Sequence, residues 1–176
     1  MALPLTLPVP EEVEEQTLRL VAEQACSAAG CVAAGVTVVR PEGLPLILGT
    51  SLLGAQMARA QWDSGDGPGI DAIGQLQVFN VACLATARSW SLFVRQAIAR
   101  GVASCLAVPI ILRGRALGAL DLYSTEPAAF DGAEQLGLHF ASEAAAALSQ
   151  IEAGLHHLLP LPVHRPGGRE RSRAVN

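Results

Sequence analysis

The stretch GVASCLAVPIILRGRALGALDLYS, residues 101–124, decides the fold. It predicts two β-strands joined by a two-residue turn at Arg113 and Gly114, because a glycine there supplies the positive φ that tight hairpin turns require. The first strand, 102–112, is almost wholly apolar, so we expect it to be buried on both faces. The second strand, 117–123, alternates leucines with small or polar residues. We therefore expect the rest of the chain to be built around this hairpin.

The register of the hairpin predicts two unlike faces. If Leu112 pairs with Arg115, then Leu106 lies opposite Asp121 and Ser104 lies opposite Tyr123. Side chains alternate along a strand, so one face would carry Ser104, Leu106, Val108, Leu117, Ala119, Asp121 and Tyr123. The other face would carry Cys105, Ala107, Pro109, Gly118, Leu120 and Leu122. The second face is therefore small and apolar, and the first carries a carboxylate and a phenol at one end.

Composition indicates one globular domain. The chain has 176 residues, of which 51% are hydrophobic and 16% charged, with a net charge of −4. Such a charge provides no general attraction to nucleic acid or to anionic membranes. No apolar run approaches the roughly 20 residues of a membrane helix, and the N-terminus lacks the basic region of a signal peptide. We therefore expect a cytoplasmic protein with no membrane partner, whose cysteines (Cys26, Cys31, Cys83 and Cys105) are free thiols.

Helix and strand signals divide the chain into three parts. Residues 1–9 are rich in proline and predicted to be extended, 10–159 form the domain, and 160–176 form a basic, disordered tail. Pro10 and the glutamates after it favour a helix over about 10–29, which Gly30 ends. Residues 32–40 and 44–50 are predicted to form a hairpin.

The middle of the chain is predicted to alternate helices and loops. Ser51 caps a helix to about residue 61, the stretch 62–71 (WDSGDGPGID) is a loop, and a short helix covers 68–73. A strand is expected over 76–82, and Ser89 is expected to cap a helix that ends at Arg100. Asp131 and Glu134 form a capping pattern at the start of the last helix.

The last helix carries a long apolar seam. Its members are three or four residues apart, as in a coiled coil: Leu136, Phe140, Ala144, Ala147, Ile151, Leu155 and Leu158. This seam either packs on the sheet and the first helix or forms a bundle between two copies. Because a long unpaired seam would leave an exposed apolar stripe, we expect a homodimer.

Three stretches in order resemble a known family: GDGPGIDA (65–72), LATARSWSLF (84–93) and the hairpin 101–124. Together, over about residues 11–150, they are similar to GAF domains, and in particular to those of bacterial signalling proteins that often precede an RNA-binding ANTAR module. That subgroup typically shows GEGPC-x-DA, then DL-x-x-DPRW-x-x-F, then a GV-x-S strand followed by LGALNLYS. The resemblance implies an α+β fold, an α/β-type sandwich with a central antiparallel sheet of five to six strands. The terminal helices would cover one face, and connecting helices and loops would enclose a ligand cavity on the other.

This chain departs from the subgroup at several positions. Gly69 stands where a cysteine is common, Cys83 where an aspartate is common, and Asp121 where asparagine is usual. Trp90 and Phe93 keep the aromatic pair. No ANTAR sequence follows, and too few residues remain after Gln150 for another domain, so we expect no direct nucleic-acid binding.

The resemblance and the chemistry of the side chains together suggest ligand-binding residues. A buried Asp121 must be paired, protonated or hydrated, and a role in a pocket and a structural role both remain open. Tyr123 offers stacking and a hydrogen bond, or ordinary strand packing, and Asp71 either binds a ligand or caps the turn. The predicted set is Asp71, Cys83, Trp90, Phe93, Ser104, Asp121 and Tyr123. No spacing of Cys and His suits zinc, and we predict no catalytic residue, metal or cofactor.

The function that follows is a non-enzymatic sensory or regulatory module in signalling or transcription regulation. It would form a homodimer through its terminal helices and bind a small molecule or a signalling protein. One alternative is a thiol-dependent reductase of the free methionine sulfoxide type that uses Cys83. Another is a degenerate sensor, whose pocket has collapsed and which acts only as a scaffold for protein interactions.

Overall fold

The computed structural model describes residues 10–41 and 43–158, with side chains for 11–41 and 43–153. Five antiparallel strands form one sheet in the order β2-β1-β5-β4-β3. The strands are β1 (Ala33–Val38), β2 (Leu46–Gly49), β3 (Phe79–Val81), β4 (Ser104–Leu112) and β5 (Arg115–Ser124). The helices are α1 (Pro10–Ala29), α2 (Leu52–Ser64), α3 (Pro68–Gln75), α4 (Ser91–Ala99) and α5 (Glu134–Leu158), with a short 3-10 turn η1 (Leu84–Thr86). This arrangement confirms the predicted fold class.

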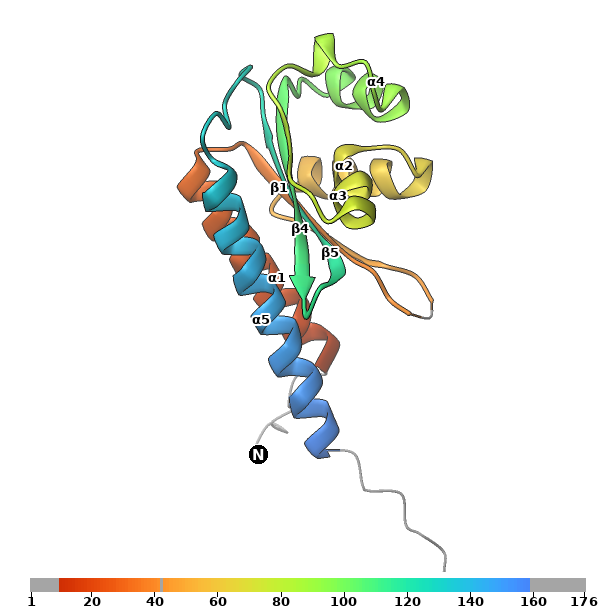
Figure 1. Ribbon diagram of the computed structural model, residues 1–176, viewed down its shortest axis with the longest axis vertical. Coiled ribbons are helices and arrows are strands. Elements are labelled where there is room, and N and C mark those ends of the chain that lie inside the picture. Colours follow the sequence, from red (N-terminus) through yellow and green to blue (C-terminus); the bar gives the residue numbers. More distant parts are fainter. Residues whose placement is uncertain (1–9, 42, 159–176) are drawn as a thin grey trace, which may run out of the picture.

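The sheet separates two layers of helices (Figure 1). On one face α1 and α5 lie side by side; on the other α2 and α3 cover the strands, and α4 packs against α2 and η1. The larger core lies under α1 and α5 and contains leucine, valine and alanine side chains, among them Leu18, Val36, Leu106, Leu120, Leu122, Ala144 and Leu148. The smaller core lies on the opposite face and includes Met57, Leu84, Phe93, Cys105 and Tyr123.

The hairpin of β4 and β5 forms as predicted at its turn but not in its register. Arg113 and Gly114 have φ values of 50° and 77°, which is the pattern of a two-residue hairpin turn. The pairing then shifts between Ile110 and Ile111, because Leu117 is an extra residue in β5. From there Ala107 faces Asp121 and Cys105 faces Tyr123.

This β-bulge makes the predicted face of β4 wrong. A slip of one residue moves every side chain of a strand to the other face. Leu106 and Val108 therefore belong to the core under α1 and α5, while Cys105 belongs to the core on the Asp121 face. The predicted faces of Asp121, Tyr123, Leu120 and Leu122 on β5 are confirmed.

Two predicted helix caps are wrong. α4 begins at Ser91 after Trp90, and its first N–H groups are capped by Asp66, whose Oδ2 accepts from Leu92 N at 2.8 Å and from Phe93 N at 3.3 Å. Because a side chain remote in sequence supplies the cap, Ser89 is not needed. α5 begins at Glu134 and not at Asp131, since the chain turns once more at Gly132 (φ 74°).

Two of the cysteines are not free thiols. Cys26 near the end of α1 and Cys31 before β1 form a disulfide, with Cα atoms 4.9 Å apart. The turn at Gly30 brings them together, which spacing alone did not indicate. Cys83 and Cys105 are free.

The seam of α5 is covered in part by the protein's own sheet and α1. Ala144 is buried, while Leu136, Phe140, Ala147 and Ile151 are half-buried; the side chains of Leu155 and Leu158 lie outside the described residues. The helix is turned so that Ala141, Ala145 and Leu148 also face the core. The homodimer thus stays a prediction. Within 10–41 and 43–158, no helix combines the length and apolar character needed to cross a bilayer.

Candidate functional site

The first part of the candidate site is a buried polar cluster beneath the start of α3. Asp121 and Tyr123 point from β5 toward α2 and α3 and are 2% and 0% exposed. Gln61 in α2, itself 1% exposed, joins Tyr123 to the start of α3. Its Nε2 donates to the Tyr123 hydroxyl at 3.0 Å, and its Oε1 accepts from Gly69 N at 2.7 Å. One amide side chain therefore holds β5 and α3 together.

Gly69 lies directly against the Asp121 carboxyl. A Cβ at position 69 would be 2.6 Å from Asp121 Oδ1 and 2.8 Å from Oδ2, so no side chain fits there. Pro68 at the first position of α3 favours the start of this short helix. The GDGPG stretch thus brings backbone, and no side chain, onto the carboxyl group.

Burial controls the charge of Asp121. Loss of solvent raises the pKa of this carboxyl from 3.8 to about 7, while the neighbouring polar groups of Gln61 and Tyr123 act in the opposite direction. Its Oδ1 has no hydrogen-bond partner among the described residues. The pKa of Tyr123 and that of Cys105 are raised well above their usual values, chiefly by burial and then by Asp121. Near neutral pH, Asp121 is thus the group of this cluster that changes charge.

The second part of the candidate site is an open groove beside β3. It has a volume of about 370 Å³ and is lined by β3, by the loop around η1 and by Trp90. Trp90 packs edge-on against Phe79 with ring centroids 5.6 Å apart, and its Nε1 donates to Asp71 Oδ2 at 2.9 Å. Cys83 also lines the groove, and hydrogen bonding to Thr86 lowers the pKa of its thiol.

The predicted site residues therefore lie in four different places. Asp121 and Tyr123 lie in the buried cluster, whereas Cys83 and Trp90 line the open groove. Asp71 does not line the groove but accepts the hydrogen bond from Trp90. Phe93 is buried in the core between α4 and the sheet. Ser104 is on the opposite face from the one predicted, because of the bulge, and donates to the carbonyl of Glu126 at 2.6 Å.

Sequence reasoning missed Gln61. Glutamine is usually exposed, and at the end of a predicted helix it showed no signal of burial. Only the packing of α2 against β5 and α3 makes its amide central. Among the described residues, no group of three or more His, Cys, Asp or Glu side chains is placed to hold a metal ion.

The chain belongs to the GAF domain family, whose model matches residues 11–149. It is similar in fold to GAF3 of a Synechocystis protein in its photoproduct state (13% identity, 83% of this chain and 99% of that chain, TM-score 0.65). It is also similar to the GAF domain of a phosphoenolpyruvate-protein phosphotransferase from Acinetobacter (14% identity, 82% and 90%, TM-score 0.62). A type II free methionine-R-sulfoxide reductase from Thermoplasma acidophilum shares the fold as well (14% identity, 81% and 97%, TM-score 0.58). None of the curated proteins matches the sequence.

Proposed function

We propose that this GAF domain is a non-enzymatic sensory or regulatory module that binds a small molecule on the Asp121/Tyr123 face of its sheet. The observation that carries the proposal is Asp121 Oδ1, a buried acceptor without a partner among the described residues. Buried polar atoms are nearly always satisfied, so a ligand that donates a hydrogen bond to this oxygen would remove a cost in free energy. The similarity of the three motifs to ANTAR-associated GAF domains supports a role in signalling or transcription regulation.

Binding on this face requires the start of α3 to move. Gly69 covers the carboxyl, and Gln61 holds Gly69 in place through one hydrogen bond. Two residues further along the same helix, Asp71 accepts the hydrogen bond from Trp90. A shift of α3 would therefore change both the buried cluster and the groove at Trp90. We propose that this coupled movement is the signal passed to a partner protein.

The ligand proposal is tested by thermal unfolding of the full chain against a panel of metabolites, with native mass spectrometry of the hits. We expect at least one hydrogen-bond donor to raise the unfolding temperature of the parent and to lose this effect in Asp121→Ala, which has no side-chain acceptor. Asp131→Asn changes an exposed carboxyl and should leave the effect intact. If no compound distinguishes the parent from Asp121→Ala, the ligand proposal fails, and the scaffold alternative, in which Gln61 and Gly69 keep the site closed, takes its place.

We also propose that α1 and α5 mediate a homodimer. Apolar side chains on these helices remain exposed in the single chain, with Leu20 at 58% and Leu138 at 36%. Sedimentation velocity should show a dimer, and a monomer at every concentration would contradict the proposal. A cytoplasmic location stays a prediction. The Cys26–Cys31 disulfide is the observation against it, because cytosolic thiols are kept reduced.

A second candidate function is the reduction of free methionine sulfoxide by Cys83. The lowered pKa of its thiol and its position in an open groove favour a nucleophile. Oxygen would pass from the sulfoxide to Cys83, giving methionine and a sulfenic acid. A thiol reductant would then form a mixed disulfide and water, and a second thiol would release Cys83. Turnover in the parent and none in Cys83→Ser is expected if this reaction occurs; no turnover in the parent, or equal turnover in both proteins, eliminates it.

A further inference from the structure

Another cavity lies on the opposite side of the sheet, at the end of the molecule near the β4–β5 turn. It has a volume of about 90 Å³ and lies between α1, α5, the end of β1 and the start of β5. Val38, Leu117, Leu148 and Ile151 provide apolar walls. This position places it away from Asp121 and from the groove beside β3.

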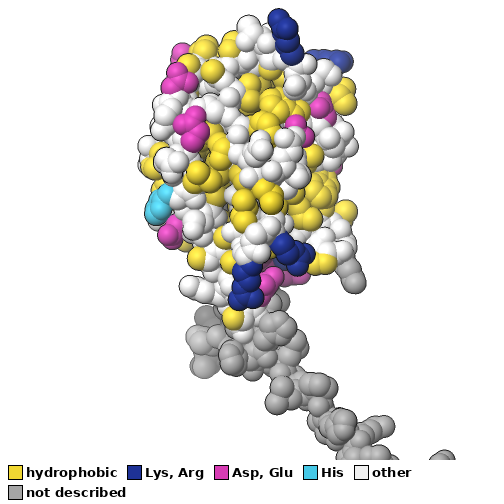
Figure 2. All heavy atoms as spheres, viewed as in Figure 1, with side chains coloured by type: hydrophobic (Ala, Val, Ile, Leu, Met, Phe, Trp, Pro, Cys, Tyr) yellow, Lys and Arg dark blue, Asp and Glu magenta, His cyan; other side chains and the backbone are white. Residues whose placement is uncertain are grey.

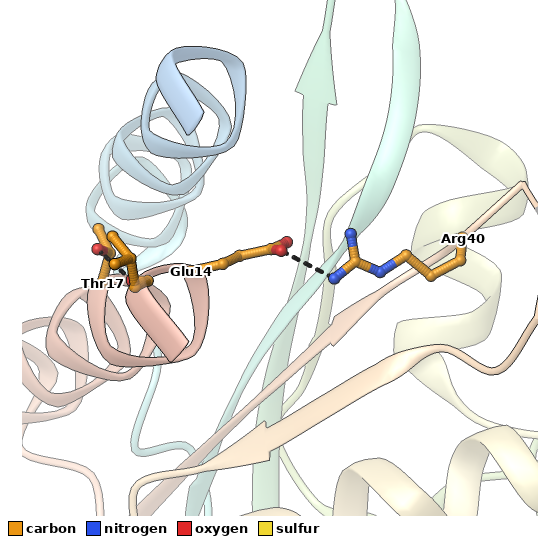
Figure 3. A network of polar contacts seen from close by, with 4 residues as sticks. Glu14, Thr17 and Arg40 are labelled. Atoms are coloured by element: carbon orange, nitrogen blue, oxygen red, sulfur yellow. Dashed lines mark hydrogen bonds and ion pairs between the residues drawn. The ribbon is translucent and has the colours of Figure 1, made fainter. Parts of the chain in front are cut away.

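Glu14 is the polar group buried in this cavity. Its side chain is 8% exposed, and its Oε2 accepts from an Arg40 guanidinium nitrogen at 2.8 Å (Figure 3). Its Oε1 is buried and has no hydrogen-bond partner among the described residues. The neighbouring hydroxyl of Thr17 does not serve it, since that group donates to the carbonyl of Val13 at 2.7 Å. One carboxylate oxygen therefore lacks the donor that burial normally demands.

The charges around the cavity favour a cation. Glu14 and Glu152 each contribute one negative charge and Arg40 one positive charge, which leaves a net charge of −1 among the charged lining residues. A second groove, which shares Arg40 with the cavity, is lined by Glu11 and Glu15. An anion placed beside Glu14 Oε1 would be repelled, whereas a cationic donor would satisfy both the charge and the hydrogen bond.

The size and lining of the cavity narrow the class of ligand. A volume of about 90 Å³ exceeds the roughly 10–15 Å³ that one water needs and is below the roughly 150 Å³ of a cavity that holds benzene. We propose that it binds the protonated end of a small primary amine. The ammonium donates to Glu14 Oε1, and a short alkyl stem packs against Leu148 and Ile151.

A wider groove adjoins the cavity, and its charges determine which group the far end of a longer amine can carry. This groove has a volume of about 350 Å³ and shares Arg40, Leu117 and Glu152 with the cavity. Arg113 and Arg115 also line it, and Figure 2 shows arginine side chains gathered at this end of the molecule. A second ammonium would be repelled there, so a monoamine is favoured over a diamine.

The probe for this proposal is n-butylammonium chloride, titrated into the full chain at low ionic strength and followed by NMR. We expect saturable shifts of the amide signals of Val38, Leu148 and Ile151. Butyrate should cause none, and n-butanol, which has the same stem without the charge, should bind at least 10-fold more weakly. If butylammonium does not saturate, if the shifts lie elsewhere, or if butanol binds equally well, the cavity holds only water or apolar molecules and the proposal is overturned.

Two variants test separately the charge of Glu14 and the open volume of the cavity. Glu14→Gln should lower the affinity for butylammonium about 10- to 100-fold, since a hydrogen bond to a charged group is lost. Glu23→Gln changes an exposed carboxylate on the same helix and should have no effect. Because Glu14→Gln also leaves Arg40 unpaired and can destabilise α1, Ile151→Phe provides a second test, which fills the cavity and keeps the ion pair. Binding of butylammonium to both variants as to the parent would overturn the proposal.

Discussion

Replacement of Asp121 by Asn should remove a specific pH dependence of stability. The folded-state pKa of this carboxyl is raised from 3.8 to about 7. A carboxyl whose pKa is raised on folding binds its proton more tightly in the folded state. Its contribution to stability is therefore complete below pH 3.8, declines as the unfolded chain ionises, and is fully lost above about pH 7. Asn has nearly the same shape and stays neutral, so the variant should not show this decline.

The size of the effect follows from the shift. The difference of about three pKa units corresponds to about 4 kcal/mol across the whole range, at about 1.4 kcal/mol per unit. Roughly 2–3 kcal/mol of that should be lost between pH 5 and pH 8. This loss is a large fraction of the roughly 5–15 kcal/mol that stabilises a domain.

The assay is urea unfolding at several values between pH 5 and pH 8, followed by circular dichroism. We expect the free energy of unfolding of the parent to fall relative to that of Asp121→Asn as the pH rises, with Asp131→Asn following the parent. Parallel pH profiles for the parent and Asp121→Asn would refute the reasoning. That result would mean that Asp121 is solvated or paired in the folded protein.

Three further predictions concern contacts around the same fold. Gly69→Ala places a methyl group 2.6 Å from Asp121 Oδ1 and should lower the free energy of unfolding in urea by about 1–3 kcal/mol. Gly74 in the same helix has nothing within 4 Å of an added Cβ, so Gly74→Ala should be neutral or stabilising. Equal effects of the two substitutions would contradict the close approach of Gly69 to Asp121. Gln61→Ala removes both bonds of the buried amide and should cost about 2–3 kcal/mol, while the exposed Gln56→Ala should change stability by less than about 0.5 kcal/mol. Thiol titration of the unfolded, unreduced chain should detect the two free cysteines, Cys83 and Cys105. Reduction of the disulfide should lower the free energy of unfolding by about 2 kcal/mol, because the loop that it closes is short. A count of four thiols before reduction would show that the disulfide does not form.

Local patterns were sufficient for much of the fold. The boundaries of α1, from Pro10 to Ala29, follow from a proline at the first position and a glycine after the end. The hairpin turn at Arg113 and Gly114 was predicted because few residues accept its backbone angles. The face of Asp121 and Tyr123 was also predictable, since alternation along β5 beyond the bulge needs no knowledge of its partner.

The predictions that were wrong or missing concerned contacts between segments that are distant in the sequence. Asp66 caps α4 from the loop after α2, and no pattern near Ser89 announces it. Gln61 matters because α2 and α3 enclose it against β5, and its position in the sequence is that of an ordinary helix end. The disulfide between Cys26 and Cys31 required the turn between α1 and β1 to place their side chains together.

The β4–β5 hairpin shows which features the sequence determines and which depend on the tertiary structure. Its sequence by itself determined that two buried strands meet at a tight turn and that β5 carries a carboxyl and a phenol on one face. Only the tertiary structure decided which face of β4 accompanies them, because one extra residue at Leu117 reverses the alternation and leaves no mark in the hydrophobic pattern. The tertiary structure also decided that Asp121 is enclosed. Its burial comes from Gly69 and Gln61, which reach it from two other elements of the chain.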